Sequence, residues 1–112
     1  MYADELHEIR GRRGISKLDA VELLKQSTWF APMMVRRGDA DGYLGGVSHN
    51  YPDIVKPCLK IIGTSEDAHR VVGSYMMTVG GQVMFIADAT INIHPDARTL
   101  AEIAVRLSLI HI

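Results

Sequence analysis

The sequence predicts one small α/β domain, and three observations lead to this fold class. The 112 residues are enough for a single domain and too few for two. Near the C-terminus, apolar residues recur with helical spacing at Leu100, Ile103, Ala104 and Leu107. Upstream of them, two segments rich in Val, Met and Tyr or Ile, residues 70–77 and 83–91, flank Gly80-Gly81, which is typical of a β-hairpin.

Helices are expected in the first forty residues. Ser16 and Asp19 have the spacing of a capping box, with Asp in place of the usual Glu, so a helix should begin at Lys17. Gly14 and Gly38 are placed to end the helices that precede them. The sequence thus predicts helices over residues 3–13, 17–26 and 29–37, the second with an apolar stripe of Leu18, Val21 and Leu24.

The middle of the chain predicts a strand, a turn and a helix. Residues 42–47 contain Tyr, Leu and Val and are expected to form a short buried strand. The polar turn 48–52 follows, and a helix capped by Asn50 or Asp53 should extend to Gly63. His94-Pro95-Asp96 opens the final helix, and residues 107–112 end on apolar side chains without a helix stop, which indicates a truncated or non-native end.

Composition excludes several classes of function. A net charge of −1 gives no field that would favour nucleic acid or an anionic membrane surface. The longest apolar stretches are too short to cross a bilayer, and the acidic N-terminus has no apolar core of a signal peptide. A single cysteine, Cys58, allows no internal disulfide and fits a reducing cytoplasm. The chain is therefore expected to be cytoplasmic.

The most informative segment is a glycine pair followed by a polar turn and a helix start. Gly45 and Gly46 permit close backbone approach, Ser48 can donate a hydrogen bond, and His49 lies in the same turn. Lys56 falls within the first turns of the following helix, whose N-terminus offers free amides and a positive partial charge. This combination suits a phosphate or carboxylate, although a tight turn with ordinary capping and an exposed lysine would have the same pattern.

Two groups of carboxylates are further candidates. Asp88 interrupts an apolar run, so its carboxylate either faces a binding cleft or accepts amides of the following turn. Asp39 and Asp41 have the spacing of a loop that binds a metal, but no further ligand is near them in the sequence, and a solvated turn explains them as well. We therefore predict a ligand site of Gly45, Gly46, Ser48, His49, Lys56 and Asp88, and no metal site.

Taken in order, several segments resemble one protein family, the phosphate acetyl/butyryltransferases together with the related C-terminal domain of NADP-dependent malic enzymes. The resemblance extends from about Tyr2 to Val105. The segments that carry it are Arg10–Gly14, Trp29–Gly42, Gly45–Pro52, Val55–Pro57, Ile86–Asn92 and Pro95 with Leu100–Ala104.

The resemblance implies a partial three-layer α/β/α phosphotransacetylase-like domain over residues 1–106, of the isocitrate/isopropylmalate dehydrogenase-like kind. In the acetyltransferases the glycine pair is typically followed by a stretch like Ala-Asp-His-Thr-Thr-Gly. Here Val47–Pro52 departs from it, and Lys56 stands where these enzymes often have an arginine of the substrate cleft. These departures resemble the malic-enzyme branch.

Three functions follow as hypotheses. The first is a fragment of the regulatory domain of an NADP-dependent malic enzyme that binds acetyl-CoA or a phosphate-type anion, itself catalytically inactive and without a cofactor of its own. In that case NADP and a divalent metal belong to a part of the parent outside this sequence, and the parent is a homo-oligomer. The second is a fragment of a phosphate acetyltransferase that moves acetyl between CoA and phosphate, and the third is a structural oligomerisation module. The isolated chain is expected to aggregate or oligomerise.

Overall fold

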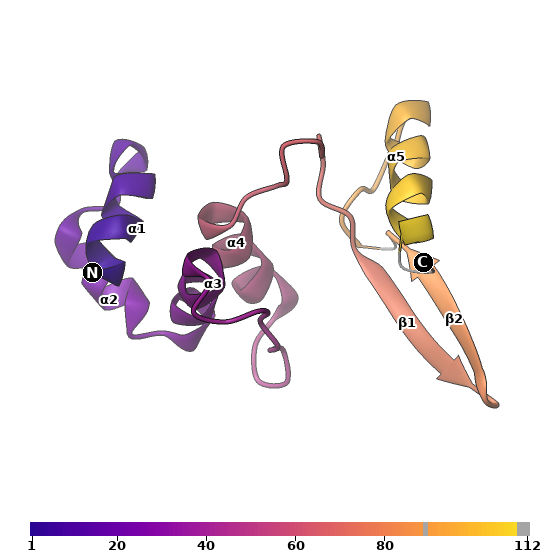
Figure 1. The fold of residues 1–112 in the computed structure, drawn as a ribbon, viewed down its shortest axis with the longest axis horizontal. Coiled ribbons are helices and arrows are strands. Elements are labelled where there is room, and N and C mark those ends of the chain that lie inside the picture. Colours follow the sequence, from indigo (N-terminus) through magenta and orange to yellow (C-terminus); the bar gives the residue numbers. More distant parts are fainter. Residues whose placement is uncertain (89, 110–112) are drawn as a thin grey trace. The chain divides into compact units, whose positions relative to one another are not determined.

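The computed structural model describes residues 1–88 and 90–109, and it divides the chain into two compact units, Met1–Gly63 and Thr64–Ile112 (Figure 1). The first unit is helical, and the second is a β-hairpin with one helix. Together they make a mixed α/β chain, as the sequence predicts at this coarse level. No described helix is long and apolar enough to cross a membrane.

Four α-helices form the first unit. They are α1 (Tyr2–Arg10), α2 (Lys17–Leu24), α3 (Ser27–Arg37) and α4 (Tyr51–Ile61), with a 3₁₀ turn at Gly11–Arg13 after α1. The predicted boundaries are confirmed within a few residues. Ser16 and Asp19 form the reciprocal capping box that starts α2, and Gly38 ends α3 with φ 76°, a left-handed conformation that glycine adopts without steric cost.

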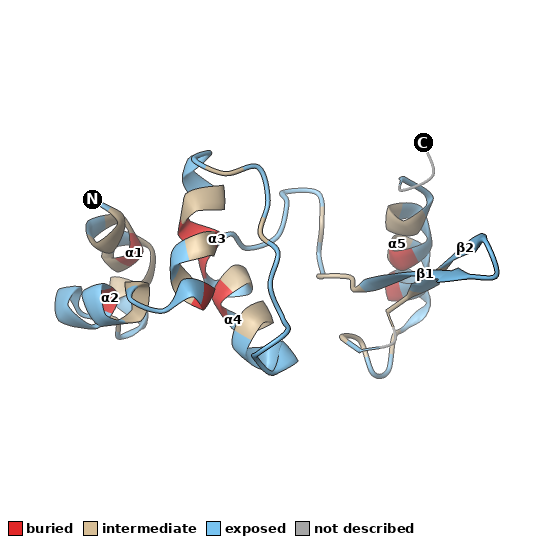
Figure 2. Ribbon diagram, turned by 90° about the horizontal axis from the view of Figure 1, so that it is seen from below, coloured by how far each residue is buried: buried red, intermediate tan, exposed pale blue. Residues whose placement is uncertain are grey.

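Each of these four helices supplies one residue to a small core. Leu6, Ala20 and Met33 have no exposed surface, and Ile61 is 1% exposed (Figure 2, red). The predicted stripe on α2 is only partly correct, because Leu18 is 80% exposed and Val21 is also exposed. Ala20 is the buried residue of α2, and Leu23 and Leu24 pack partly buried against the same core.

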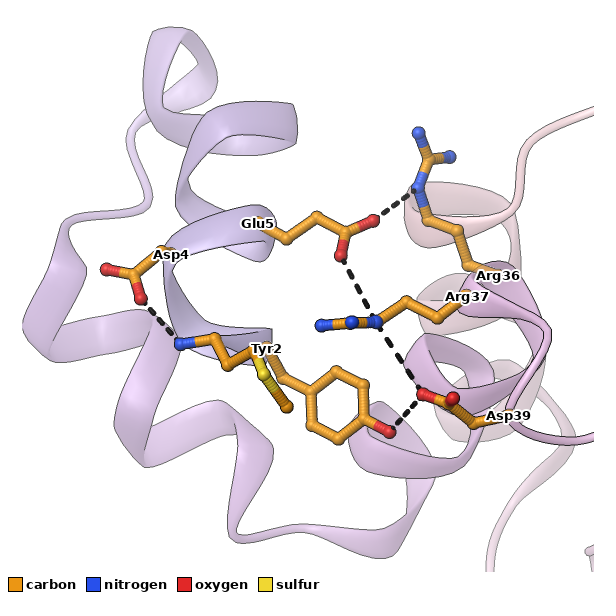
Figure 3. A network of polar contacts seen from close by, with 7 residues as sticks. Tyr2, Asp4, Glu5, Arg36, Arg37 and Asp39 are labelled. Carbon is orange, nitrogen blue, oxygen red and sulfur yellow. Dashed lines mark hydrogen bonds and ion pairs between the residues drawn. The ribbon is translucent and has the colours of Figure 1, made fainter.

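Polar side chains join α1 to α3 at the edge of this core (Figure 3). The Tyr2 hydroxyl donates a 2.6 Å hydrogen bond to Asp39, and the Arg37 guanidinium lies 5.1 Å from the centre of the Tyr2 ring. Glu5 is within 4 Å of both Arg36 and Arg37. The hydrogen bond to Asp39 is the main reason why the pKa of Tyr2 is raised. Asp39 thus has a structural use, and no group of three or more metal-binding side chains occurs among the described residues.

Two arginines hold the C-terminal end of α4. Arg36 Nη1 donates to the carbonyl oxygen of Ile61 at 2.7 Å, and Arg10 Nε donates to that of Lys60 at 2.7 Å. These carbonyls have no partner within the helix, and a cation is favourable at the negative end of the helix dipole. The contacts therefore fix the end of α4 relative to α1 and α3.

The second unit contains β1 (Ser74–Val79), β2 (Gln82–Ala87) and α5 (Ala97–Ser108). The strands pair antiparallel with Met77 opposite Met84, and Gly80 and Gly81 form the predicted turn with φ 58° and 79°. Asp96 caps α5 by accepting the Thr99 amide at 2.8 Å. Both strands are shorter than predicted, and β2 ends because Asp88 has φ 52° and turns the chain.

The predicted buried strand at residues 42–47 is wrong. The segment forms no strand, Leu44 is 98% exposed and Val47 is fully exposed. Its apolar residues match a strand pattern, but a strand requires a hydrogen-bonded neighbour, and the two strands in the described part of the chain pair with each other. The described residues contain a two-stranded sheet, so the three-layer arrangement that the resemblance implies stays a prediction.

Candidate functional site

The first unit contains a groove of about 470 Å³ between the start of α3 and one face of α4. We call it the α3–α4 groove. Its α3 wall consists of Gln26, Ser27, Thr28 and Trp29, and its α4 wall of His49, Pro52, Asp53, Lys56, Pro57 and Lys60.

Helical spacing brings the two lysines of the groove to the same side of α4. Lys56 and Lys60 are four residues apart, which corresponds to about one turn and ~6 Å along the axis. No carboxylate in the described parts of the chain lies within ion-pair distance of either ammonium group. Asp53 also lines the groove and accepts a 3.4 Å hydrogen bond from Asn50. The groove is therefore lined by more positive than negative side chains.

The start of α3 faces the same groove. An α-helix leaves its first amides without partners inside the helix and has a positive partial charge at this end. The N-cap residue Gln26 makes no side-chain hydrogen bond to them. The carbonyl of Gln26 accepts the amides of Trp29 and Phe30, which leaves those of Ser27 and Thr28. Lysine ammonium groups and free helix amides together are suited to bind an anion, phosphate above all.

Two of the predicted site residues, His49 and Lys56, line the groove. Ser48 precedes them, and its hydroxyl lies 3.2 Å from His49 Nδ1. Gly45 and Gly46 lie farther back on the exposed connection between α3 and α4, with Gly46 at φ 136°. The groove thus includes His49 and Lys56 of the predicted ligand site and excludes its two glycines.

Asp88 belongs to the second unit, whereas the other predicted site residues belong to the first. Its carboxylate accepts hydrogen bonds from the amides of Ile91 and Asn92 and from the Asn92 side chain. Burial alone would raise the pKa of Asp88, but these hydrogen bonds stabilise the charged form and lower it overall. The geometry matches the structural alternative, a carboxylate that holds the turn after β2.

Sequence reasoning missed Lys60 and the start of α3 as parts of this site. Lys60 could have been found from its spacing, because a residue four positions after Lys56 on a helix shares its face. The contribution of Ser27 and Thr28 depends on how α3 packs against α4, which no local pattern reports. Cys58, on the same helix, does not line the groove, and burial raises the pKa of its thiol.

Comparison with known proteins identifies relatives along almost the whole chain. Residues 1–108 match the family described as phosphate acetyl/butaryl transferase. The chain is 33% identical over 107 residues, 96% of its length, to a phosphate acetyltransferase of Nitratidesulfovibrio vulgaris, and covers 15% of that protein. It is 40% identical over 86 residues, 77% of its length, to the phosphate acetyltransferase of Bacillus subtilis, and covers 27% of it.

A third relative, the phosphate acetyltransferase of Corynebacterium glutamicum, is 33% identical over 104 residues, which make up 93% of this chain and 32% of that protein. The chain thus spans a third or less of the length of these three relatives. The matched region contains the helices that form the groove as well as the hairpin and α5. The chain belongs to the phosphate acetyl/butyryltransferase family.

Proposed function

We propose that this chain is part of a phosphate acetyltransferase, which transfers an acetyl group between coenzyme A and phosphate. The observation that carries the proposal is the α3–α4 groove, where Lys56 lines a hollow that is suited to bind an anion, in a chain of this family. The relatives named above are phosphate acetyltransferases. The chain covers 15–32% of their length, so we assign the reaction to a whole protein that contains it.

In this proposal Lys56 holds an anionic substrate while the acetyl group is transferred. In the direction of acetyl phosphate synthesis, a phosphate oxygen attacks the thioester carbon, a C–O bond forms, the C–S bond breaks and the thiolate of coenzyme A leaves. The negative charge of phosphate, and the charge that develops during the reaction, must be neutralised by a group that is held in position. The ammonium group of Lys56 can do this as a compact point charge. His49 lines the same groove and would complete this site, with the Ser48 hydroxyl 3.2 Å from its Nδ1.

A second candidate is the regulatory domain of an NADP-dependent malic enzyme, with acetyl-CoA as an effector in the same groove. Lys56 in place of an arginine, and the Val47–Pro52 segment, favour it. The identity to phosphate acetyltransferases over most of the chain makes the first candidate stronger. Both candidates share the three-layer α/β/α domain as the complete fold, and both imply a homo-oligomeric parent. A purely structural module would bind no ligand in the groove.

The test uses the complete protein encoded by the reading frame that contains these residues. Release of coenzyme A from acetyl-CoA is measured with and without phosphate, and malate-dependent reduction of NADP is measured in parallel. We expect phosphate-dependent release, and we expect Lys56→Ala to lower kcat/KM for phosphate by about a hundredfold. Lys25→Ala is the matched control, because Lys25 is an exposed lysine of the same unit that pairs with Glu22 outside the groove.

The outcomes separate the candidates. Reduction of NADP by malate without phosphate-dependent release would establish the second candidate instead of the first. Phosphate-dependent release that Lys56→Ala leaves unchanged would retain the reaction and remove Lys56 from its site. If neither reaction occurs and acetyl-CoA and phosphate do not shift the melting temperature, the structural module remains.

A further inference from the structure

The wall of the α3–α4 groove contains a polar group that the proposed role of Lys56 leaves unused. Thr28 is 5% exposed, and its hydroxyl has no hydrogen-bond partner within residues 1–88 and 90–109. A buried hydroxyl without a partner costs free energy and is uncommon in folded proteins. No side-chain oxygen or nitrogen that is completely enclosed in the described chain lacks a partner. The Thr28 oxygen therefore retains access to open space, and the groove is the hollow that this residue lines.

The amides beside this hydroxyl are also unused. The first amides of α3 that bond to a carbonyl are those of Trp29 and Phe30, so the amides of Ser27 and Thr28 are left over. The side chain of Gln26 does not cap them. Helix α3 is eleven residues long, so the partial charge at its N-terminus is fully developed. One hydroxyl and two amides thus lie together at the positive end of a helix, in the arrangement that oxyanions favour.

Lys60 supplies the positive charge next to this cluster. Its ammonium nitrogen lies 5.4 Å from the centre of the Trp29 ring, which belongs to the first turn of α3. A cation–π contact at an exposed position is weak, so an anion at the start of α3 can draw the ammonium group away from the ring. Lys60, one helical turn after Lys56, is thus placed to contact an anion at the start of α3.

We propose that the start of α3 and Lys60 form a second phosphate subsite, so that the groove takes a ligand with two linked phosphate groups. The location of the first subsite rests on the proposed function, which assigns it to Lys56. The ~6 Å rise between the lysines is comparable with the reach of a diphosphate, since each ammonium group extends on a flexible side chain. Coenzyme A contains a diphosphate, and free pyrophosphate has the same chemistry.

The chain has a built-in reporter for this proposal. Trp29 is its single tryptophan and lines the groove, so the tryptophan emission of the protein comes from the site itself. The 112-residue chain is titrated with pyrophosphate, coenzyme A and inorganic phosphate, with sodium chloride at matched ionic strength as the control. We expect saturable changes, with pyrophosphate bound at least tenfold more tightly than phosphate because it occupies both subsites.

Two variants test the subsite at the start of α3. Thr28→Val keeps the shape of the side chain and removes the hydroxyl, and Lys60→Met keeps the length and removes the charge. Each should weaken pyrophosphate binding roughly tenfold, the factor expected for one hydrogen bond or contact to a charged group, with less effect on phosphate. Lys25→Met should bind like the unmodified chain. Far-UV circular dichroism and melting temperatures establish that each variant is folded.

Equal affinities for pyrophosphate and phosphate would overturn the proposal, and so would unchanged pyrophosphate binding in folded Thr28→Val and Lys60→Met. Lys56→Met separates this result from the proposed function. If it leaves phosphate binding intact while the other two variants lose pyrophosphate, the α3 subsite stands and the role of Lys56 fails. Coenzyme A binding as tightly as pyrophosphate identifies an organic diphosphate as the ligand, whereas pyrophosphate binding alone identifies the free anion.

Discussion

Replacing Leu6 with alanine should destabilise the helical unit by about 3 kcal/mol. Leu6 has no exposed surface and packs in one cluster with Ala20, Met33 and Ile61. It therefore lies where all four helices meet. The substitution removes three buried carbon atoms, worth ~2.4 kcal/mol in transfer free energy. The cavity left behind adds to this loss, and buried Leu→Ala substitutions cost about 2–5 kcal/mol in total.

Such a loss is large for a unit of this size. At roughly 0.05–0.15 kcal/mol per residue, residues 1–63 would have a stability of about 3–9 kcal/mol. Urea unfolding followed by Trp29 emission measures it, because Trp29 packs against the same core. With a slope of about 1 kcal/mol per molar urea, the midpoint should fall by ~3 M.

Leu18→Ala is the matched control, because the same substitution is made in the neighbouring helix at a residue that is 80% exposed. Its midpoint should correspond to a change within about 0.5 kcal/mol. Equal losses in the two variants would refute the assignment of Leu6 to the core and Leu18 to the surface. A midpoint for Leu6→Ala equal to that of the unmodified chain would refute it as well.

Two further predictions concern the second unit. Because the pKa of Asp88 is lowered in the folded chain, its contribution to stability is present above its unfolded pKa of about 3.9 and is lost as pH falls through the lowered value. Asn tolerates a φ of 52°, so Asp88→Asn can keep the turn. The substitution should speed exchange of the Ile91 and Asn92 amides at pH 7 and remove most of the acid dependence of this exchange. Acid dependence equal to that of the unmodified chain would contradict this. Gly81→Ala should destabilise the hairpin by about 1–2 kcal/mol, because φ at this position is 79°. Amide exchange in β1 and β2 measures this loss, and unchanged exchange would contradict the strain.

Local signals explain what could be predicted of the fold. The capping box of Ser16 and Asp19, the left-handed Gly38 and the Asp96 cap each depend on residues within about four positions of one another. The hairpin turn at Gly80-Gly81 depends on two residues that tolerate positive φ. Such interactions are complete within a short segment, so the sequence contains all the information that they need.

The wrong predictions share a different cause. Residues 42–47 have the composition of a strand, but a strand exists only where another strand pairs with it. Leu18 and Val21 have the spacing of a buried stripe, but Ala20 faces the core because of how α2 packs against its neighbours. An apolar pattern indicates which residues could be buried. The helices and strands that pack against them decide which of these residues are buried.

The sequence by itself determined the helices, the hairpin, the family and the presence of Lys56 beside a polar turn. Only the tertiary structure placed Lys56 and Lys60 opposite the start of α3, which precedes them by about thirty residues in the chain. That arrangement depends on the shared core of Leu6, Met33 and Ile61 and on the contacts from Arg10 and Arg36 to the end of α4. Contacts between distant segments form when helices pack, so no local pattern in the sequence encodes the groove that they create.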